Sequence, residues 1–379
     1  MKQYLIIGNG IAGTSAAQSI RKYDQNGKID IVTQEEFPFY ARIRLPDYIA
    51  EVIDVKKLIL HQDKWYYDND INIRTQTKII DIDYHKKKAK DQKGNIFGYN
   101  SLLIATGSKP FFPFIPGNDK KNIFVLRNIG DANNIMSAAR KAKRIIIVGG
   151  GLLGLETAYA LIRKSYSIVV LELIDRLLPR QIDKQGSALI MNLLEKKGFK
   201  FKLNAKVRKI IGHDFVKGLE LDSGEIVDGD MIIISAGVRA NLDIPLKLKL
   251  KTKRGTIVNS KMQTSINDIY AAGDVAQIEE THLCLWSIAD KQGEIAGANM
   301  AGYSQDYEGA IPLNHLSIAG IKLSSAGNID VENLLDNDIK MREQIYQKFV
   351  RKEGKLVGCI MINDTIGFTD IAKKIAGKK

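Results

Sequence analysis

A glycine-rich turn near the start of the chain combines residue types and spacing that suit nucleotide binding. The apolar run Tyr4–Ile7 predicts a strand buried on both faces, and G-x-G-x-x-G follows it. Such glycines permit a sharp turn and bring the backbone close to a pyrophosphate, which the N-terminus of the next helix attracts through its free N–H groups and its dipole. The residues expected at the nucleotide are Gly8, Gly10, Ile11, Ala12 and Gly13.

The same motif recurs 141 residues further along the chain. The apolar run 144–148 leads into Gly149, Gly151 and Gly154, and a helix is expected over 155–164. A single glycine-rich turn also occurs in proteins where nothing binds. Two copies, each between a buried strand and a helix, predict a duplicated dinucleotide-binding domain.

Acidic residues follow each motif about twenty residues downstream, at the end of the next predicted strand. The first is Glu35, with Glu36 as an alternative, and the second is Glu172. A carboxylate at this point accepts hydrogen bonds from ribose hydroxyls and repels a 2′-phosphate, so Glu172 favours NADH over NADPH. Arg176 either weakens that preference by pairing with a 2′-phosphate or simply begins the next helix.

Three further turns of small residues end predicted strands, at the edge of an α/β sheet where ligands bind. They are Ala105-Thr106-Gly107, Ala236-Gly237 and Gly273-Asp274. Asp274 places a lone carboxylate at that edge. In the irregular basic segment 39–46, Arg42 is either a partner for a pyrophosphate or ribityl chain or, like Arg44, an ordinary loop residue.

The composition is that of a globular protein with two or three domains: 379 residues, 45% hydrophobic and 26% charged. No apolar run is long enough for a transmembrane helix and the first strand begins at once, so we expect a cytoplasmic protein that does not bind a membrane. Cys284 and Cys359 form no pair in the sequence and the histidines show no metal-ligand spacing, so no metal site is expected. The formal net charge of +13 favours an acidic macromolecular partner.

The sequence changes character from Ile311 onwards. Antiparallel strands are expected over 318–327 and 346–362, with a hairpin turn at Gly354, and a closing helix is expected over 369–376. Residues 311–379 therefore predict a small α+β domain.

In their order along the chain, the two glycine motifs and the three small-residue turns resemble the two-dinucleotide-binding-domain flavoproteins, the FAD-dependent pyridine nucleotide-disulfide oxidoreductases. The resemblance covers residues 1 to about 305. It implies a glutathione-reductase-like α/β fold with two three-layer Rossmann-like domains, which hold FAD and NAD(P)H. The implied division is a discontinuous FAD domain of residues 1–109 and 237–310, an NAD(P)H domain of residues 110–236, and the C-terminal domain.

The resemblance also implies roles for single residues. Asp274 is expected at the ribityl-phosphate region of FAD, and the helix that begins at Trp286 is expected to stabilise the reduced flavin. Glu156 is the implied catalytic residue beside the flavin; the alternative is an ordinary acid in the first turn of a helix. The remaining cofactor contacts implied are Glu35, Arg42, Ile79, Ala105, Thr106, Gly107, Gly237 and Gly273.

Two cysteine arrangements of the family are missing from this chain, and this restricts the branches that it resembles. The chain has no redox C-x-x-x-x-C pair, and Ile43 stands where NADH oxidases and coenzyme A disulfide reductases have a single cysteine. The segment 40–45, Glu156 and Trp286 are similar to the rubredoxin and ferredoxin reductase branch, and the short C-terminal domain is most similar to clostridial-type NADH:rubredoxin reductases. Relatives in that branch often pair the glutamate with a lysine, whose position here is Asp47.

These features predict an oxidoreductase without a redox-active disulfide, which passes electrons from NADH through FAD to a small acidic iron–sulfur carrier. Rubredoxin is the favoured carrier, NADPH is disfavoured, and a monomer or weak dimer is expected. Two alternatives stay open. One is an NADH oxidase or a reductase module for another acceptor, as in nitrite reductases. The other is a protein like apoptosis-inducing factor with a basic binding surface, although the charge clusters carry few of the aromatic side chains that nucleic acid binding favours.

Overall fold

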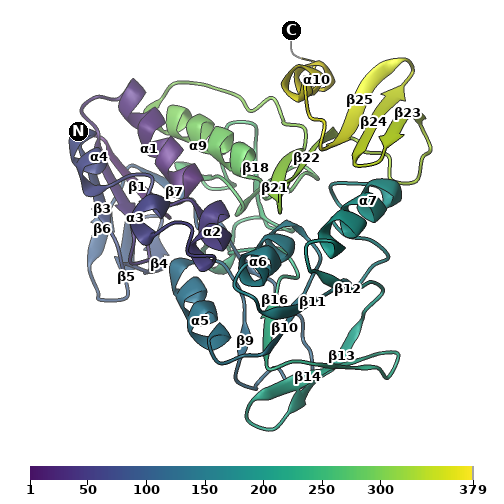
Figure 1. The fold of residues 1–379 in the computed structure, drawn as a ribbon. Coiled ribbons are helices and arrows are strands. Elements are labelled where there is room, and N and C mark those ends of the chain that lie inside the picture. Colours follow the sequence, from purple (N-terminus) through teal and green to yellow (C-terminus); the bar gives the residue numbers. More distant parts are fainter. Residues whose placement is uncertain (378–379) are drawn as a thin grey trace. The chain divides into compact units, whose positions relative to one another are not determined.

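The computed structural model describes residues 1–377, which form two compact units (Figure 1). Unit 1 comprises Met1–Ala41, Val55–Lys109 and Val238–Gly309. Unit 2 comprises Arg42–Asp54, Pro110–Gly237 and the chain from Ala310 onwards. The division into an FAD, an NADH and a C-terminal domain stays a prediction. Residues 378 and 379 of the predicted C-terminal domain lie outside the described residues.

Unit 1 is built on a parallel sheet in the order β19-β7-β1-β2-β3. Its central strand β1 contains the apolar run Tyr4–Ile7, which is buried on both faces as the sequence predicts. The parallel strands are β1 (Gln3–Ile7), β2 (Lys28–Val32), β3 (Ile71–Arg74), β7 (Ser101–Ile104) and β19 (Ile269–Ala271). The smaller strands are β4 (Ile79–Asp83), β5 (Lys88–Asp91), β6 (Ile96–Gly98), β8 (Ser108–Pro110), β17 (Val238–Ala240), β18 (Thr256–Val258) and β20 (Ala276–Ile278).

Two helices of unit 1 pack unusually closely, because small residues face each other. A Cβ atom on Gly293 would lie 2.2 Å from the Ala12 oxygen, and one on Gly297 would lie 2.3 Å from the Ala16 oxygen. These residues belong to α1 (Ile11–Tyr23) and α9 (Trp286–Ala301). Such distances leave no room for a side chain, so the small residues in the predicted helix after Trp286 have a packing reason. The other helices of unit 1 are α3 (Val55–Leu58), α4 (Asp63–Asp68) and α8 (Asp243–Lys247).

Unit 2 contains a second parallel sheet, in the order β12-β11-β10-β16-β9. Its strands are β9 (Ile123–Phe124), β10 (Arg144–Val148), β11 (Ser167–Leu171), β12 (Lys200–Lys202) and β16 (Met231–Ile234). Its helical segments are η1 (Arg42–Arg44), α2 (Leu45–Ile49), α5 (Ile129–Ala139), α6 (Leu152–Ile162) and α7 (Lys184–Glu195).

The two sheets share one plan, which confirms the duplication expected from the repeated motif. Each motif strand, β1 or β10, has the next strand in sequence on one side and the strand before the next small-residue turn on the other. Each unit also inserts a three-stranded antiparallel sheet at the same point, β4-β5-β6 in unit 1 and β13-β14-β15 in unit 2. The latter strands are β13 (Val207–Gly212), β14 (Val216–Leu221) and β15 (Ile226–Asp228).

The C-terminal part of unit 2 is an antiparallel sheet in the order β21-β22-β25-β24-β23, with α10 (Phe368–Ile375) packed against it (Figure 1). The strands are β21 (Leu313–Ile318), β22 (Ile321–Gly327), β23 (Asp336–Arg342), β24 (Ile345–Lys352) and β25 (Lys355–Ile362). The predicted turn at Gly354, with φ of +74°, and the closing helix are confirmed. The strand expected over 318–327 is wrong at its start, because the chain turns at Ala319-Gly320 between β21 and β22.

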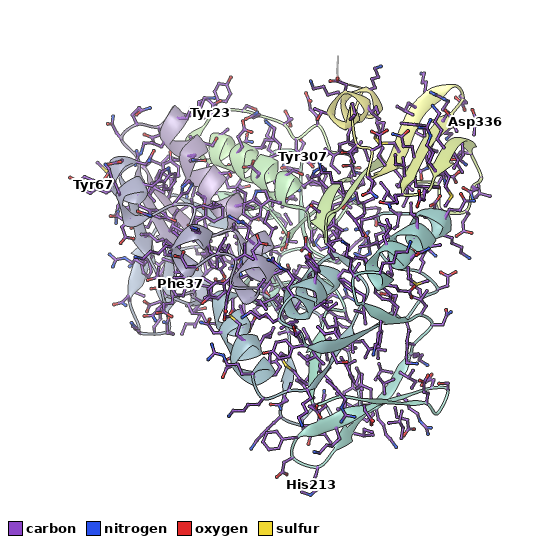
Figure 2. The ribbon with its side chains drawn as sticks, in the orientation of Figure 1. Tyr23, Phe37, Tyr67, His213, Tyr307 and Asp336 are labelled. Atoms are coloured by element: carbon purple, nitrogen blue, oxygen red, sulfur yellow. The ribbon has the colours of Figure 1, made fainter. Side chains whose placement is uncertain are left out.

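Within residues 1–377, no helix is both long enough and apolar enough to cross a membrane. The same residues contain no group of three or more acidic, histidine or cysteine side chains that could hold a metal ion. His213 projects from the turn between β13 and β14 (Figure 2), and its side chain is 99% exposed. Cys284 and Cys359 are free thiols, the first half-buried and the second buried.

Candidate functional site

The first and third glycines of the first motif are required by close backbone contacts. A Cβ atom on Gly8 would lie 2.1 Å from the Ala105 oxygen, and one on Gly13 would lie 2.0 Å from the Gly8 oxygen. Gly8 also has φ of +117°, a conformation that other residues rarely adopt. These contacts hold the turn against the neighbouring strand and against the start of α1.

The second motif repeats these contacts almost distance for distance. A Cβ atom on Gly149 would lie 2.2 Å from the Ser235 oxygen, and one on Gly154 would lie 2.1 Å from the Gly149 oxygen. Gly149 has φ of +121°. The two turns are therefore the same local structure built twice.

The middle glycines have no such packing reason. A Cβ atom on Gly10 or Gly151 would meet nothing within 4 Å among the described residues. Both glycines are the N-cap residues of helices, α1 and α6, and neither helix has a side-chain hydrogen bond at its cap. Each turn thus leaves open space beside free N–H groups at a helix N-terminus, which fits the pyrophosphate of a dinucleotide.

The carboxylate predicted for the first nucleotide is Glu35, in the loop after β2. The Tyr40 hydroxyl donates a hydrogen bond of 2.5 Å to Glu35 Oε2, and Glu35 is half-buried, whereas Glu36 is exposed. The tyrosine holds the Glu35 carboxylate in a fixed orientation. This contact favours Glu35 over the alternative.

Asp274 lies three residues after the end of β19, and both its carboxylate and its backbone oxygen have polar contacts. The Ser108 hydroxyl donates to Asp274 Oδ2 at 2.6 Å, and His282 Nε2 lies 2.8 Å from the Asp274 carbonyl oxygen. The Gly273 N–H donates to Gln292 Oε1 of α9 at 2.9 Å. The sequence assigned no contact to Ser108, because this serine stands in no motif of its own.

The turn Ala105-Thr106-Gly107 of unit 1 is held by an asparagine that the sequence did not single out. Asn241 Nδ2 donates to the Thr106 oxygen at 2.7 Å, and the Asn241 N–H donates to the Gly107 oxygen at 2.9 Å. Ala105 is buried, and Gly107 has φ of +66°. Gly237, which belongs to unit 2, has φ of +90° and open space at its Cβ position.

Two predicted FAD contacts in unit 1 have different surroundings. Trp286 is half-buried at the first position of α9, and its ring stacks on Phe39 with 5.7 Å between the ring centroids. Ile79, the first residue of β4, is 4% exposed and belongs to the hydrophobic core of unit 1. Ile11 packs against the same core, which also includes Ala12.

Glu172 is fixed by the backbone of the second motif and of its own loop. Its Oε2 accepts the Gly150 N–H at 2.7 Å, and its Oε1 accepts the Ile174 N–H at 3.1 Å. The loop closes further on Gly150, because the Leu178 N–H donates to the Gly150 oxygen at 3.1 Å. A carboxylate has about four acceptor positions, so Glu172 keeps capacity for ribose hydroxyls.

Arg176 is held within the same loop. Its guanidinium lies 2.9 Å from Asp175 Oδ1, while Lys184 Nζ lies 2.8 Å from Asp175 Oδ2. Arg176 and Lys184 therefore share the carboxylate of Asp175. Arg176 precedes α7 by eight positions, so it does not begin that helix.

Glu156 lies on α6 next to a second carboxylate. Burial and the neighbouring charge of Asp47 on α2 raise the pKa of Glu156 to about 7. Asp47 itself pairs with Arg44 at 3.1 Å. Helix α6 begins at Leu152, three residues earlier than expected, so Glu156 lies beyond the first turn and the alternative of a first-turn acid is wrong.

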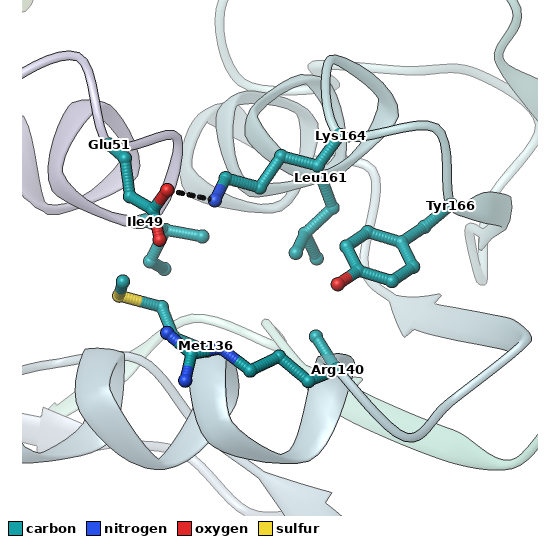
Figure 3. Close-up of a pocket in the computed structure, with 8 residues that line it drawn as sticks. Ile49, Glu51, Met136, Arg140, Leu161, Lys164 and Tyr166 are labelled. Carbon is teal, nitrogen blue, oxygen red and sulfur yellow. Dashed lines mark ion pairs between the residues drawn. The ribbon is translucent and has the colours of Figure 1, made fainter.

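The segment 42–54 is bound to α5 and α6 within unit 2. Arg42 donates to the Arg127 oxygen at 3.0 Å, and the Tyr48 hydroxyl donates to Asn133 Oδ1 at 2.8 Å. Glu51 Oε2 lies 2.6 Å from Lys164 Nζ, beside a small pocket lined also by Ile49, Met136, Ala139, Arg140, Leu161 and Tyr166 (Figure 3). The hydrogen bond and the charge of Lys164 lower the pKa of Glu51, and the charge of Arg140 adds to this effect.

Comparison with known proteins shows the family to which this chain belongs. Residues 2–293 match the pyridine nucleotide-disulphide oxidoreductase family, and residues 312–379 match the C-terminal domain of rubredoxin NAD⁺ reductase. The chain belongs to the pyridine nucleotide-disulphide oxidoreductase family. The match agrees with the predicted cofactors, FAD and NADH, and together with the structural similarity it confirms the predicted fold class.

Within this family, one relative and its crystal structure are similar to this chain along almost its whole length. The chain is 31% identical to the NADH-rubredoxin oxidoreductase of Clostridium acetobutylicum over 99% of this chain and 94% of that protein. The crystal structure of NADH:rubredoxin oxidoreductase from the same organism superposes with a TM-score of 0.84 at 30% identity, over 100% of this chain and 96% of that chain. These matches confirm the similarity to the clostridial reductases.

A longer relative is similar to an equal degree. The nitrite reductase [NAD(P)H] of Bacillus subtilis is 32% identical over 96% of this chain. The chain spans only 46% of the length of that relative.

Proposed function

We propose that this protein oxidises NADH and passes the electrons through FAD to rubredoxin, a small acidic iron–sulfur carrier. The observation that carries the proposal is the similarity to a clostridial NADH-rubredoxin oxidoreductase along 99% of this chain, including the C-terminal domain. The net charge of +13 supports an acidic partner, since opposite charges steer two proteins together.

The residues of this chain have distinct roles in the proposal. The motif turn around Gly10, with Glu35 and Asp274, holds FAD, and the turn around Gly151, with Glu172, holds NADH. When bound, the two cofactors supply hydride transfer and release of electrons one at a time. Ile43 stands where related oxidases have a single cysteine, so the proposal includes no thiol step at that position.

Rapid mixing without oxygen tests the proposal. NADH is expected to reduce the bound flavin quickly, and oxidised rubredoxin is expected to reoxidise it just as quickly. Fast reduction by NADH followed by no reoxidation by rubredoxin would exclude this acceptor while leaving the NADH site intact.

One alternative acceptor has support of its own. The similarity to a nitrite reductase of about twice the length of this chain favours an electron-transfer module that serves a different redox centre. In the same experiment, reoxidation by another carrier but not by rubredoxin would identify such a module. The cytoplasmic location, the monomer or weak dimer and the absence of nucleic acid binding stay predictions.

A further inference from the structure

We propose that Tyr346 and Lys348 of the C-terminal domain are positioning residues for the NADH-binding loop, and that they act through Asp183. The inference rests on the proposed function, in which the turn around Gly151 holds NADH together with Glu172, the first residue of the loop 172–183. All of these residues belong to unit 2.

Asp183 is the point where the loop, a helix and the C-terminal sheet meet. It is the N-cap of α7, where its Oδ1 accepts the Gly186 N–H at 2.9 Å. Its Oδ2 accepts the Tyr346 hydroxyl at 2.6 Å and lies 3.2 Å from Lys348 Nζ. Asp183 is 2% exposed, and Tyr346 and Lys348 are 0% exposed. The carboxylate is therefore buried and shared between the helix cap and strand β24.

Lys348 has a full set of acceptors. Besides Asp183, its ammonium donates to the Asp330 carbonyl oxygen at 2.7 Å and to Asn333 Oδ1 at 2.7 Å. Three acceptors match the three N–H bonds of the group, which makes burial of the charge possible. A buried ion pair adds little stability over apolar side chains of similar volume, but it fixes geometry. Lys348 thus fixes where Asp183 lies.

Helix α7 transmits that position to the nucleotide loop. The Leu177 N–H donates to Ser187 Oγ of α7 at 2.8 Å, and the next residue, Leu178, donates its N–H to the oxygen of Gly150 in the motif. Leu178 is fully buried with φ of +50°, a conformation that persists only where surrounding contacts enforce it.

The helix and the sheet also approach closely at Gly186. A Cβ atom there would lie 3.3 Å from Ile362 Cδ1 and 3.4 Å from Tyr346 Cδ1. A shift of the C-terminal sheet would thus move α7, and through α7 the backbone that faces the pyrophosphate.

Binding of ADP-ribose, measured by calorimetry on the FAD-loaded protein, tests the proposal without any electron acceptor. Lys348→Met is expected to raise the Kd for ADP-ribose by about tenfold, because a small displacement of binding groups has large effects. Tyr346→Phe, which removes only one hydrogen bond, is expected to have a smaller effect in the same direction. Lys352→Met, an exposed lysine on the same strand, is the matched control and should leave the Kd unchanged.

A double variant separates positioning from loss of fold. Asp183→Asn with Lys348→Met removes both charges and keeps a capping side chain, so it should recover the thermal stability that Lys348→Met alone loses. The proposal predicts that the affinity for ADP-ribose does not recover with it. A wild-type Kd in the folded double variant would overturn the proposal. If the wild-type protein itself does not bind ADP-ribose, the NADH assignment fails, and the positioning role fails with it.

Discussion

Single carboxylates in this protein differ in what holds them, and this difference decides what each can do. Glu172 accepts two backbone N–H groups and stays oriented toward the second motif. Among residues 1–377, the charge that shifts the pKa of Glu156 is that of another carboxylate, Asp47. The first arrangement keeps a negative charge in place, and the second stabilises a proton.

The choice between nicotinamide cofactors should depend on the charge of Glu172. Glu172→Gln keeps the shape of the side chain, so the contact with Gly150 is largely retained while the repulsion of a 2′-phosphate is lost. We expect the preference for NADH over NADPH, as the ratio of kcat/KM for flavin reduction, to fall by about tenfold. Glu225→Gln, in an exposed turn, is the control and should not change it. Equal changes for both cofactors would remove Glu172 from this role.

The stability of the protein should depend on pH through Glu156. Burial and the charge of Asp47 raise the pKa of Glu156 from its ordinary value of 4.5 to about 7. At pH values between these two, the folded state holds a proton that the unfolded chain has released. The free energy of unfolding therefore declines as pH rises through this range. Glu156→Gln should abolish on the order of 2 kcal/mol of that decline, as measured by denaturant unfolding at about pH 5 and about pH 8.

A substitution at Asp47 tests whether its charge contributes to the raised pKa of Glu156. Asp47→Asn removes the neighbouring negative charge, so it should lower the pKa of Glu156 and reduce part of the decline. Identical pH dependence in the wild type and in Glu156→Gln would show that Glu156 does not hold the proton.

At the scale of helices and turns, glycines serve two purposes that can be separated. Gly297 lets α9 approach α1, since a Cβ atom there would lie 2.3 Å from the Ala16 oxygen, whereas Gly10 borders open space and has an ordinary φ of −88°. The first glycine is needed for packing, and the second is needed only where a ligand comes close.

Alanine at these two positions should therefore have opposite effects. Gly297→Ala should destabilise the FAD-free protein by about 1–3 kcal/mol, since the helices must move apart. Gly10→Ala should leave the melting temperature of the FAD-free protein nearly unchanged but weaken FAD retention, as measured by flavin content after gel filtration. Gly10→Ala with full flavin content would argue against a pyrophosphate at this turn.

At the scale of the whole molecule, the net charge of +13 should control association with an acidic carrier. The second-order rate of rubredoxin reduction should fall by about tenfold or more from low to high ionic strength, since the Debye length shrinks from about 30 Å at 0.01 M to about 3 Å at 1 M. Flavin reduction by NADH in the same solutions serves as the control and should change less. A rate with carrier that is independent of salt would argue against electrostatic steering.

The sequence by itself determined the local units of this protein. Runs such as Tyr4–Ile7 and 144–148 have only one stable place, inside a parallel sheet, and the glycines after them specify the turn. The duplication, both sheets' central strands and the two predicted nucleotide turns follow from short stretches of chain. Helices α5 and α7 were not predicted, although each begins with a capping side chain, Asn128 or Asp183, and buries residues at helical spacing.

Only the tertiary structure decided which distant residues meet. Nothing local in the sequence indicates that the segment 42–54 binds α5 and α6, that Asp47 lies near Glu156, or that Lys348 reaches Asp183. Such contacts depend on how the chain packs between elements far apart in sequence, where burial and charge act through space. That packing turned Glu156 into a group that titrates near neutral pH and turned a lysine of the C-terminal strand into part of the nucleotide domain.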